Sequence, residues 1–264
     1  MDRVEGGRRL SLNDDDVLAV VKLLGDTAGL PGAIPARRRH LIAGVAALIG
    51  ADVWAWVASR GQPDGRPSPL WAIDSIEDEA RRGTFWKASA SPRFNEEVIR
   101  QMGLDRPHVP QHVTTLFRAD LLPDDYRPHF RNTCNELGLA HLMFSMYTLG
   151  PGTRSAIGIH RAPGRPPYGE RERAIVHLVF GQVDRLHRAG TDVPANRPDV
   201  IELPPRVREM LVHVITGKSR KQIATQMQLS GHTVGDYFKI LYNHFGVSSR
   251  AELQAQFVGD AQPD

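Results

Sequence analysis

Apolar residues recur every three or four positions near the start of the chain, which is the spacing of an amphipathic helix. One such run covers residues 17–24 and follows the acidic residues 14–16, whose negative charges suit a helix N-terminus. A second run covers residues 42–49 and stops at Gly50, a residue type that commonly ends helices. The pattern therefore predicts two successive helices before any strand.

Between residues 52 and 160 the pattern changes to short apolar segments bounded by Gly and Pro, of which the first, residues 52–59, is rich in Trp and Val. Such segments favour β-strands, and two of them joined by a tight turn form a hairpin. We predict one hairpin around the turn 61–65 and another around the turn 150–152. The predicted strands are residues 52–59 with 69–76, and residues 139–149 with 155–160.

Three further runs with helical spacing predict helices at residues 93–102, 124–137 and 169–188. The order helix, hairpin, helices, hairpin, helix predicts an α+β fold, an antiparallel sheet with helices on its faces. This order resembles the GAF and PAS classes of sensory domains, in which a long last helix leads toward an effector.

The last quarter of the chain predicts four short helices. Pro205 opens the first, and Ser219, Ser230 and Ser249 can cap the second, third and fourth. Only a short turn separates the second helix from the third, which is the helix-turn-helix layout. The apolar stripe of the third helix consists of Val234, Phe238, Leu241 and Phe245.

The residues of this region also resemble one known family. The matching runs, correctly spaced throughout, are 203–211, 217–224, 229–234 and 245–253. They are similar to the LuxR-type DNA-binding domain. The resemblance implies a transcriptional regulator whose third helix enters the major groove of double-stranded DNA. It also implies a homodimer that pairs through the last helix.

The resemblance, carried over position by position, implies a set of DNA-contacting residues. Gly235 stands where the family usually has Lys, which should lower the salt dependence of binding. Asp236 can accept a hydrogen bond from a cytosine or repel phosphate. For the basic residues the alternative is a solvated surface. The candidate DNA-binding residues are Lys218, Arg220, Lys221, Thr233, Gly235, Asp236 and Lys239.

Composition narrows the functional class. Of 264 residues, 41% are hydrophobic, which is ordinary for a globular protein of one large or two modest domains. The net charge of +3 lies in residues 1–198, whereas residues 199–264 carry seven charges of each sign. Net charge alone therefore does not indicate nucleic-acid binding. The single cysteine, Cys134, excludes an internal disulfide and a cysteine-rich zinc site.

Other signals are missing from the sequence. No apolar run is long enough for a membrane span, and the first residues lack the apolar core of a secretory signal, so a cytoplasmic protein is expected. Hydrolase, zinc-protease and phosphate-loop motifs do not occur. We therefore expect no enzyme, no catalytic residues, no metal and no cofactor.

We predict a sensory or dimerisation domain at residues 12–189, a linker at 190–199 and the helix-turn-helix domain at 200–258. The linker segment holds two prolines and no apolar periodicity. In the hypothesised mechanism, a small-molecule or protein signal moves the helix 169–188 and so repositions the DNA-binding domains. Aromatic residues could line a ligand pocket or simply pack in the core, namely Trp54, Trp56, Trp71, Phe144 and Tyr147.

Two alternatives remain open for the first domain. Receptors for acyl-homoserine lactones carry a Trp-x-x-x-Tyr signature, but here Trp54 and Trp56 are followed by Ala58 and Arg60 at that step. The other alternative is a protein-regulated or ligand-free DNA binder whose first domain only dimerises. A saturable shift in melting temperature with a small molecule separates the sensor from a ligand-free binder.

Overall fold

The computed structural model describes residues 12–105, 111–194 and 199–258. Its helices are Asp14–Gly29 (α1), Ile34–Ile49 (α2), Glu79–Ser89 (α3), Pro92–Gln101 (α4), Arg127–Leu137 (α5), Glu170–Phe180 (α6), Asp184–Arg188 (α7), Pro205–Ile215 (α8), Arg220–Met227 (α9), Gly231–Phe245 (α10) and Arg250–Val258 (α11). Its strands are Val53–Gly61 (β1), Pro67–Asp74 (β2), His112–Leu116 (β3), His141–Gly150 (β4) and Thr153–Arg161 (β5). The short 3-10 helices η1 and η2 cover Ala119–Leu121 and Val200–Glu202.

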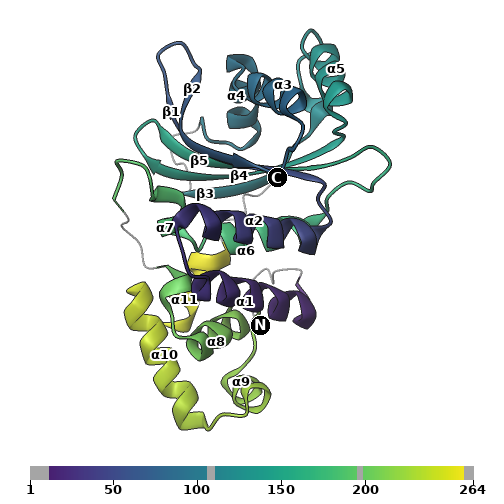
Figure 1. The fold of residues 1–264 in the computed structure, drawn as a ribbon. Helices are drawn as coiled ribbons and strands as arrows, with labels where there is room; N and C mark the ends of the chain where they lie inside the picture. The colour runs from purple at the N-terminus through teal and green to yellow at the C-terminus, as the bar shows by residue number, and fades with distance from the viewer. Residues whose placement is uncertain (1–11, 106–110, 195–198, 259–264) are drawn as a thin grey trace, which may run out of the picture.

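The five strands form one antiparallel sheet in the order β2-β1-β5-β4-β3. Both predicted hairpins are confirmed, as β1 with β2 and β4 with β5. Helices α3, α4 and α5 lie on one face of this sheet, and α2 and α6 cover the other (Figure 1). The predicted α+β fold class with its all-α C-terminal part is therefore confirmed. Part of the predicted linker, residues 195–198, lies outside the described residues.

Helix α1 forms a further layer between the sheet's helices and the C-terminal helices (Figure 1). Asn13 accepts a hydrogen bond from the backbone N–H of Asp16 and so caps the helix, as the acidic start suggested. The helix approaches α2 closely because Gly44 has no side chain. A Cβ at that position would lie 2.3 Å from Leu23 Cδ1.

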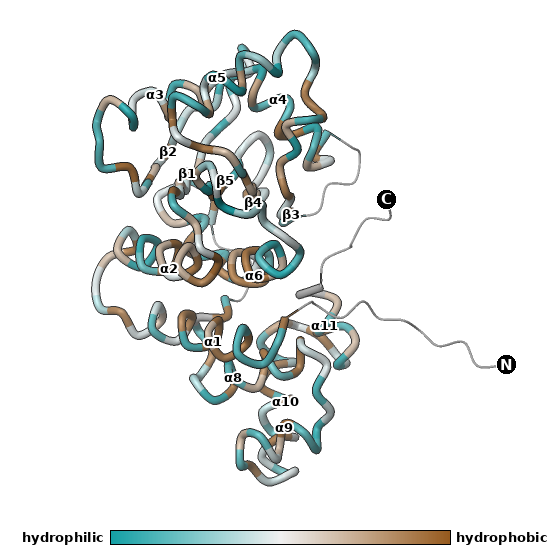
Figure 2. Tube along the Cα trace, turned by 90° about the vertical axis from the view of Figure 1, so that its right-hand side faces the viewer, coloured by the Kyte–Doolittle hydropathy of each residue, from teal (hydrophilic) through white to brown (hydrophobic). Residues whose placement is uncertain are grey.

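A single apolar cluster runs through the layers of the molecule. It begins at Trp56 on the sheet, continues through α2, α6 and α1, and reaches Leu211 of α8 and Phe238 of α10. Hydrophobic residues gather where α2, α6 and α1 meet (Figure 2). The C-terminal helices therefore share their core with the sheet layer.

The predicted single helix at 169–188 is wrong. The segment forms α6 and α7 with a break at Gly181, where an added Cβ would lie 2.8 Å from His112 Nδ1 on β3. Helix α7 is anchored on the sheet, since Arg188 pairs with Asp184 at 2.7 Å and donates to the Leu149 carbonyl at 2.7 Å. The same segment contacts the residues just before α8, because the Val200 N–H donates to the Gln182 carbonyl at 3.2 Å and Arg185 lies 3.1 Å from Glu202. The break changes the shape of the hypothesised signal route without excluding it.

Two elements were not predicted from the sequence. Helix α3 buries only Phe85 and therefore has no apolar stripe to detect. Strand β3 is a five-residue strand at the edge of the sheet. Among the described helices, none is long and apolar enough to cross a lipid bilayer.

The core contains buried neutral histidines. His187 donates from Nε2 to the Phe180 carbonyl at 2.8 Å, so its Nδ1 accepts from the Ser155 hydroxyl at 2.8 Å. Burial lowers the pKa of His187 to about 4. Burial likewise lowers the pKa of His160, on the opposite face of the sheet, to about 3. Protonating either ring would place an uncompensated charge in the core.

We predict that stability falls as the pH is lowered from 7 to 5.5. The folded pKa values lie below the unfolded value near 6.5, so the unfolded chain binds more protons and is favoured by acid. His160 and His187 should each cost roughly 1 kcal/mol over this interval. Urea unfolding at the two pH values measures the change. His187→Gln should reduce the pH dependence relative to wild type; an equal dependence in the two proteins would contradict the assignment.

Candidate functional site

A short turn joins α9 to α10, and hydrogen-bonded caps together with one left-handed residue define its backbone conformation. Ser219 and Ser230 cap the two helices by accepting hydrogen bonds from the backbone N–H groups of Gln222 and Thr233. Gln228 ends α9 in the left-handed conformation with φ of 54°. The predicted helix-turn-helix geometry is therefore present. The predicted apolar stripe of α10 is fully buried, which leaves the opposite side of the helix facing solvent.

An aspartate, a lysine and a histidine meet on this exposed side of α10. Asp236 lies 2.9 Å from Lys239 Nζ and 3.1 Å from His232 Nδ1. The hydrogen bond from Lys239 lowers the pKa of Asp236, which therefore stays ionised at neutral pH. Exposed ion pairs of this kind contribute little to stability, so Lys239 can leave Asp236 for a phosphate at small cost.

The other candidate DNA-binding residues differ in their availability. Arg220 stacks over the Phe238 ring at 4.8 Å, and Lys221 is exposed. The Thr233 hydroxyl lies 2.9 Å from the Ser230 hydroxyl and completes the cap. A Cβ at Gly235 would meet nothing within 4 Å, so the position is open. Apart from Lys218, the candidates lie in the first turn of α9 or in the first three turns of α10.

Lys218 points toward the N-terminal helix instead. Its Nζ lies 2.9 Å from Asp14 Oδ1, and only 13% of its side chain is exposed. The acidic residues that open α1 therefore have distinct roles. Asp14 reaches the C-terminal helices, and Asp16 accepts hydrogen bonds from Arg171 of α6, one of them 3.0 Å from Nε. Asp15 between them is exposed.

A buried arginine, Arg208, lies in the contact between α1 and α8, which we call the seam. Arg208 donates from Nε to the Val200 carbonyl at 3.1 Å and from Nη2 to the Leu203 carbonyl at 2.8 Å. A Cβ at Gly25 of α1 would lie 3.3 Å from Arg208 Nη1. Burial lowers the pKa of Arg208. Sequence reasoning missed this seam because its members are nearly two hundred positions apart.

The far face of the sheet, under α3 and α4, lines a partly open cavity of about 540 Å³. Its floor is made of small residues of β1 and β5, chiefly Ala55, Val57, Ala156 and Gly158. Larger apolar side chains of α4, among them Phe94 and Val98, close it from the other side. Small residues on the sheet opposite large ones on the helices leave room that a uniform apolar face would fill.

Of the five aromatic residues predicted for a pocket, only Phe144 lines this cavity. Trp54, Trp56 and Tyr147 are buried on the opposite face of the sheet. The two tryptophans lie in the core beneath α2 and α6, and Tyr147 packs against α7, where its hydroxyl donates to Asp184. Trp71 lies beneath the Arg38 guanidinium at 3.4 Å. Successive strand residues alternate between faces, and the pattern did not show which face would hold the cavity.

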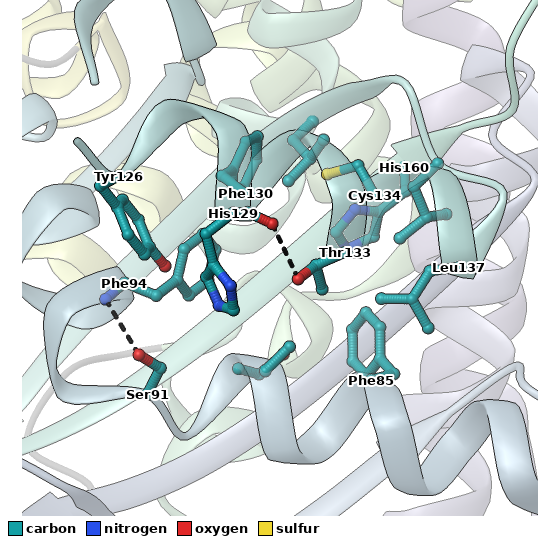
Figure 3. Close-up of a pocket in the computed structure, with 14 residues that line it drawn as sticks. Phe85, Ser91, Phe94, Tyr126, His129, Phe130, Thr133, Cys134, Leu137 and His160 are labelled. Carbon is teal, nitrogen blue, oxygen red and sulfur yellow. Dashed lines mark hydrogen bonds between the residues drawn. The ribbon is translucent and has the colours of Figure 1, made fainter. Parts of the chain in front are cut away.

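A smaller pocket of about 60 Å³ adjoins the cavity beneath α5 (Figure 3). Phe85, Phe94 and His160 line both spaces. Cys134 also faces the smaller pocket, and burial raises the pKa of its thiol to about 11. The thiol is therefore protonated and unreactive at neutral pH.

Comparison with known proteins agrees with the geometry of the C-terminal helices. The family of bacterial regulatory proteins described as the luxR family matches residues 202–256. The C-terminal helices therefore form a luxR-family DNA-binding domain, which is the kind of module that the helix-turn-helix geometry defines. No protein among the curated sequences matches the chain.

Several solved structures are similar in arrangement. SdiA in complex with octanoyl-rac-glycerol is 16% identical, with 93% of this chain and 96% of that chain covered and a TM-score of 0.42. CepR2 of Burkholderia cenocepacia, an N-acylhomoserine-lactone-dependent LuxR-family factor, is 13% identical, with 67% and 95% covered and a TM-score of 0.47. The VqsR ligand-binding domain of Pseudomonas aeruginosa is 14% identical, with 67% and 96% covered and a TM-score of 0.43.

We predict that Gly235→Lys strengthens DNA binding. The position is open, and a new cation there can neutralise one further phosphate. The slope of log K against log salt should steepen by about 0.9 for a single added contact. Gly235→Ala is the matched control, because it raises helix propensity by about 1 kcal/mol without adding charge. Titrating a labelled duplex at several salt concentrations gives both slopes; a Lys slope equal to the Ala slope would place this surface away from DNA.

Proposed function

We propose that the protein is a cytoplasmic, dimeric, sequence-specific regulator of transcription that acts by binding and not by catalysis. In this proposal α10 enters the major groove, and residues 200–258 form the DNA-binding domain. Residues 12–189 form a sensory domain whose cavity holds a small apolar ligand. The observation that carries the proposal is the luxR-family match over a helix pair whose outer side is exposed and whose apolar side is buried.

The charges on the exposed side of α10 support weak electrostatic binding to DNA. Lys239 is ion-paired with Asp236 on the same helix, so the outer side of α10 carries little net positive charge. Arg220 and Lys221 at the start of α9 are the remaining candidate phosphate contacts. Phosphate contacts position a protein on the duplex, and base contacts set its specificity. Affinity therefore depends on each remaining cation.

Helix α1 supplies a route from the sensory domain to DNA. It packs on α2 and α6 on one side and on α8 on the other. Its Asp14 holds Lys218, a residue at the start of the helix-turn-helix that would otherwise be available to phosphate. A ligand that shifts the sensory domain would alter this contact and the position of α8 together. This route runs beside the one expected through residues 169–188, whose Gln182 and Arg185 contact η2.

The alternative of a protein-regulated or ligand-free binder predicts the same DNA-binding surface without a ligand. The cavity of about 540 Å³ favours the ligand-controlled form, since drug-sized ligands occupy spaces of this order.

The proposed DNA binding is tested by selecting bound sequences from a random duplex pool. Wild type should enrich a palindromic site with half-sites about one helical turn apart, as expected for a dimer. Lys239→Ala should lose the enrichment, whereas Lys87→Ala, which removes an exposed lysine from α3, should retain it. Failure of wild type to enrich any sequence, or indifference to Lys239, would overturn the proposed reading helix.

We also predict that Asp14→Ala tightens binding to non-specific DNA. Releasing Lys218 adds one cation, so affinity at low salt should rise by several-fold and the salt slope should steepen by about 0.9. Asp15→Ala makes the same charge change one residue away at an exposed position. The two variants separate the specific contact from the general effect of charge. Equal effects of the two substitutions would contradict the proposed restraint on Lys218.

A further inference from the structure

The register of β1 and β5 arranges the cavity floor in rows. Ala55 pairs with Gly158, Val57 with Ala156, and Ser59 with Arg154. Because every second residue points to the same face, these pairs form consecutive rows under α3 and α4. The first two rows are small and apolar, and the third is polar. The floor therefore changes from apolar to charged toward the end of the strands.

Arg154 is the charged residue at the polar end. Among the described residues lining the cavity it alone carries a formal charge at neutral pH, and no acidic side chain lines the space with it. Its guanidinium makes no ion pair or hydrogen bond with any residue that the structure describes. A half-buried cation beside an apolar space is well placed to bind an anionic group.

His160 marks the other end of the cavity. Its side chain is 3% exposed, lines the cavity, and has no hydrogen-bond partner at either ring nitrogen among the described residues. The ring lies over Gly158, where an added Cβ would be 3.0 Å from His160 Nε2. Buried polar groups are nearly always hydrogen-bonded, so this ring is suited to a polar atom of a bound molecule.

Two of the nitrogen donors between these two ends are already engaged, and the Ser89 hydroxyl lines the space near His160. Trp86 donates from Nε1 to Asp74 at 3.0 Å, and Asn95 donates to the carbonyls of Ser89 and Ser91 at 2.8 and 2.9 Å. The middle of the cavity thus presents an apolar surface. His160 lies six positions beyond Arg154 on β5, which corresponds to about 20 Å along the sheet.

We propose that the cavity binds an elongated apolar carboxylic acid, with its carboxylate on Arg154 and a hydroxyl or carbonyl group near its far end hydrogen-bonded to His160. This inference rests on the proposed sensory role of the cavity and adds the chemical class of the ligand. It distinguishes the ligand from a neutral acyl lactone, which would leave Arg154 without a counter-charge.

The test uses the full chain and calorimetric titration with three probes: dodecanoate, dodecanol and 12-hydroxydodecanoate. Wild type should bind dodecanoate about tenfold or more tightly than dodecanol, as a charge-assisted hydrogen bond supplies. The 12-hydroxy acid should bind several-fold more tightly than dodecanoate. Arg154→Gln should abolish the preference for the acid over the alcohol, and Arg154→Lys should restore part of it. His160→Phe should remove only the gain from the terminal hydroxyl.

Two control substitutions test whether the probes bind in the cavity and whether the preference for the acid depends on Arg154 itself. Arg60→Gln removes a charge from the neighbouring strand, where the side chain reaches Thr153 and Asp192, and should not alter the preference. Ala156→Leu fills the middle of the floor and should weaken binding of all three probes. Melting curves without ligand confirm that each variant is folded.

Equal binding of acid and alcohol by wild type, or an acid preference that survives Arg154→Gln, would overturn the proposed ligand class. Probe binding that is indifferent to Ala156→Leu would also overturn it, since the molecule would then lie elsewhere. If the acid does not bind but another apolar compound does so in a manner sensitive to Ala156→Leu, the sensory role stands and the ligand class fails. Neither result depends on DNA binding, which the sequence selection tests separately.

Discussion

The burial of α1 from both sides is the packing constraint on which the rest of the structure depends. An amphipathic surface helix buries one stripe, whereas α1 contacts α2 and α6 and also α8. Gly44 lets α2 approach, and Gly25 leaves room for Arg208 on the opposite side. Removing this helix would expose apolar surface on both neighbours. The sheet layer and the DNA-binding helices are consequently parts of one core, and the ion pair of Asp14 with Lys218 lies at its margin.

The two faces of the sheet have different roles, since one forms the packed core and the other lines the cavity. One face carries Trp54 and Trp56 and is filled by α2 and α6, with hydrogen-bonded polar groups such as Ser155 and His187 inside it. The other carries small residues and an unpartnered His160 and leaves a cavity. A fully hydrogen-bonded polar network makes a core rigid, whereas a buried polar group without a partner beside a cavity can hydrogen-bond to a ligand. The same strands thus anchor the fold on one side and select a molecule on the other.

The sequence predicted the elements whose periodicity is local, and less of what depends on distant contacts. Both hairpins and the four C-terminal helices follow from short-range patterns and caps. The break at Gly181 depends on His112, some seventy residues away, and α3 buries too little to show a stripe. Within the candidate site, the exposed side of α10 followed from its buried stripe. The ion-pair partner of Lys218 could not be predicted, because Asp14 lies at the other end of the chain. Of the aromatic residues predicted to line a pocket, Phe144 alone lies on the face that holds the cavity.

The shared core is tested most directly by comparing the stability of the two parts in one molecule. All four tryptophans lie between residues 54 and 86, so their fluorescence reports unfolding of the sheet layer alone. Amide hydrogen exchange of residues 205–245 reports the DNA-binding helices. We expect the slowest amides of α8 to exchange with the same free energy that tryptophan fluorescence gives for unfolding of the sheet. Exchange of α8 through a separate opening of clearly lower free energy, with the tryptophans still in their folded environment, would show that the two parts are independent and contradict the account.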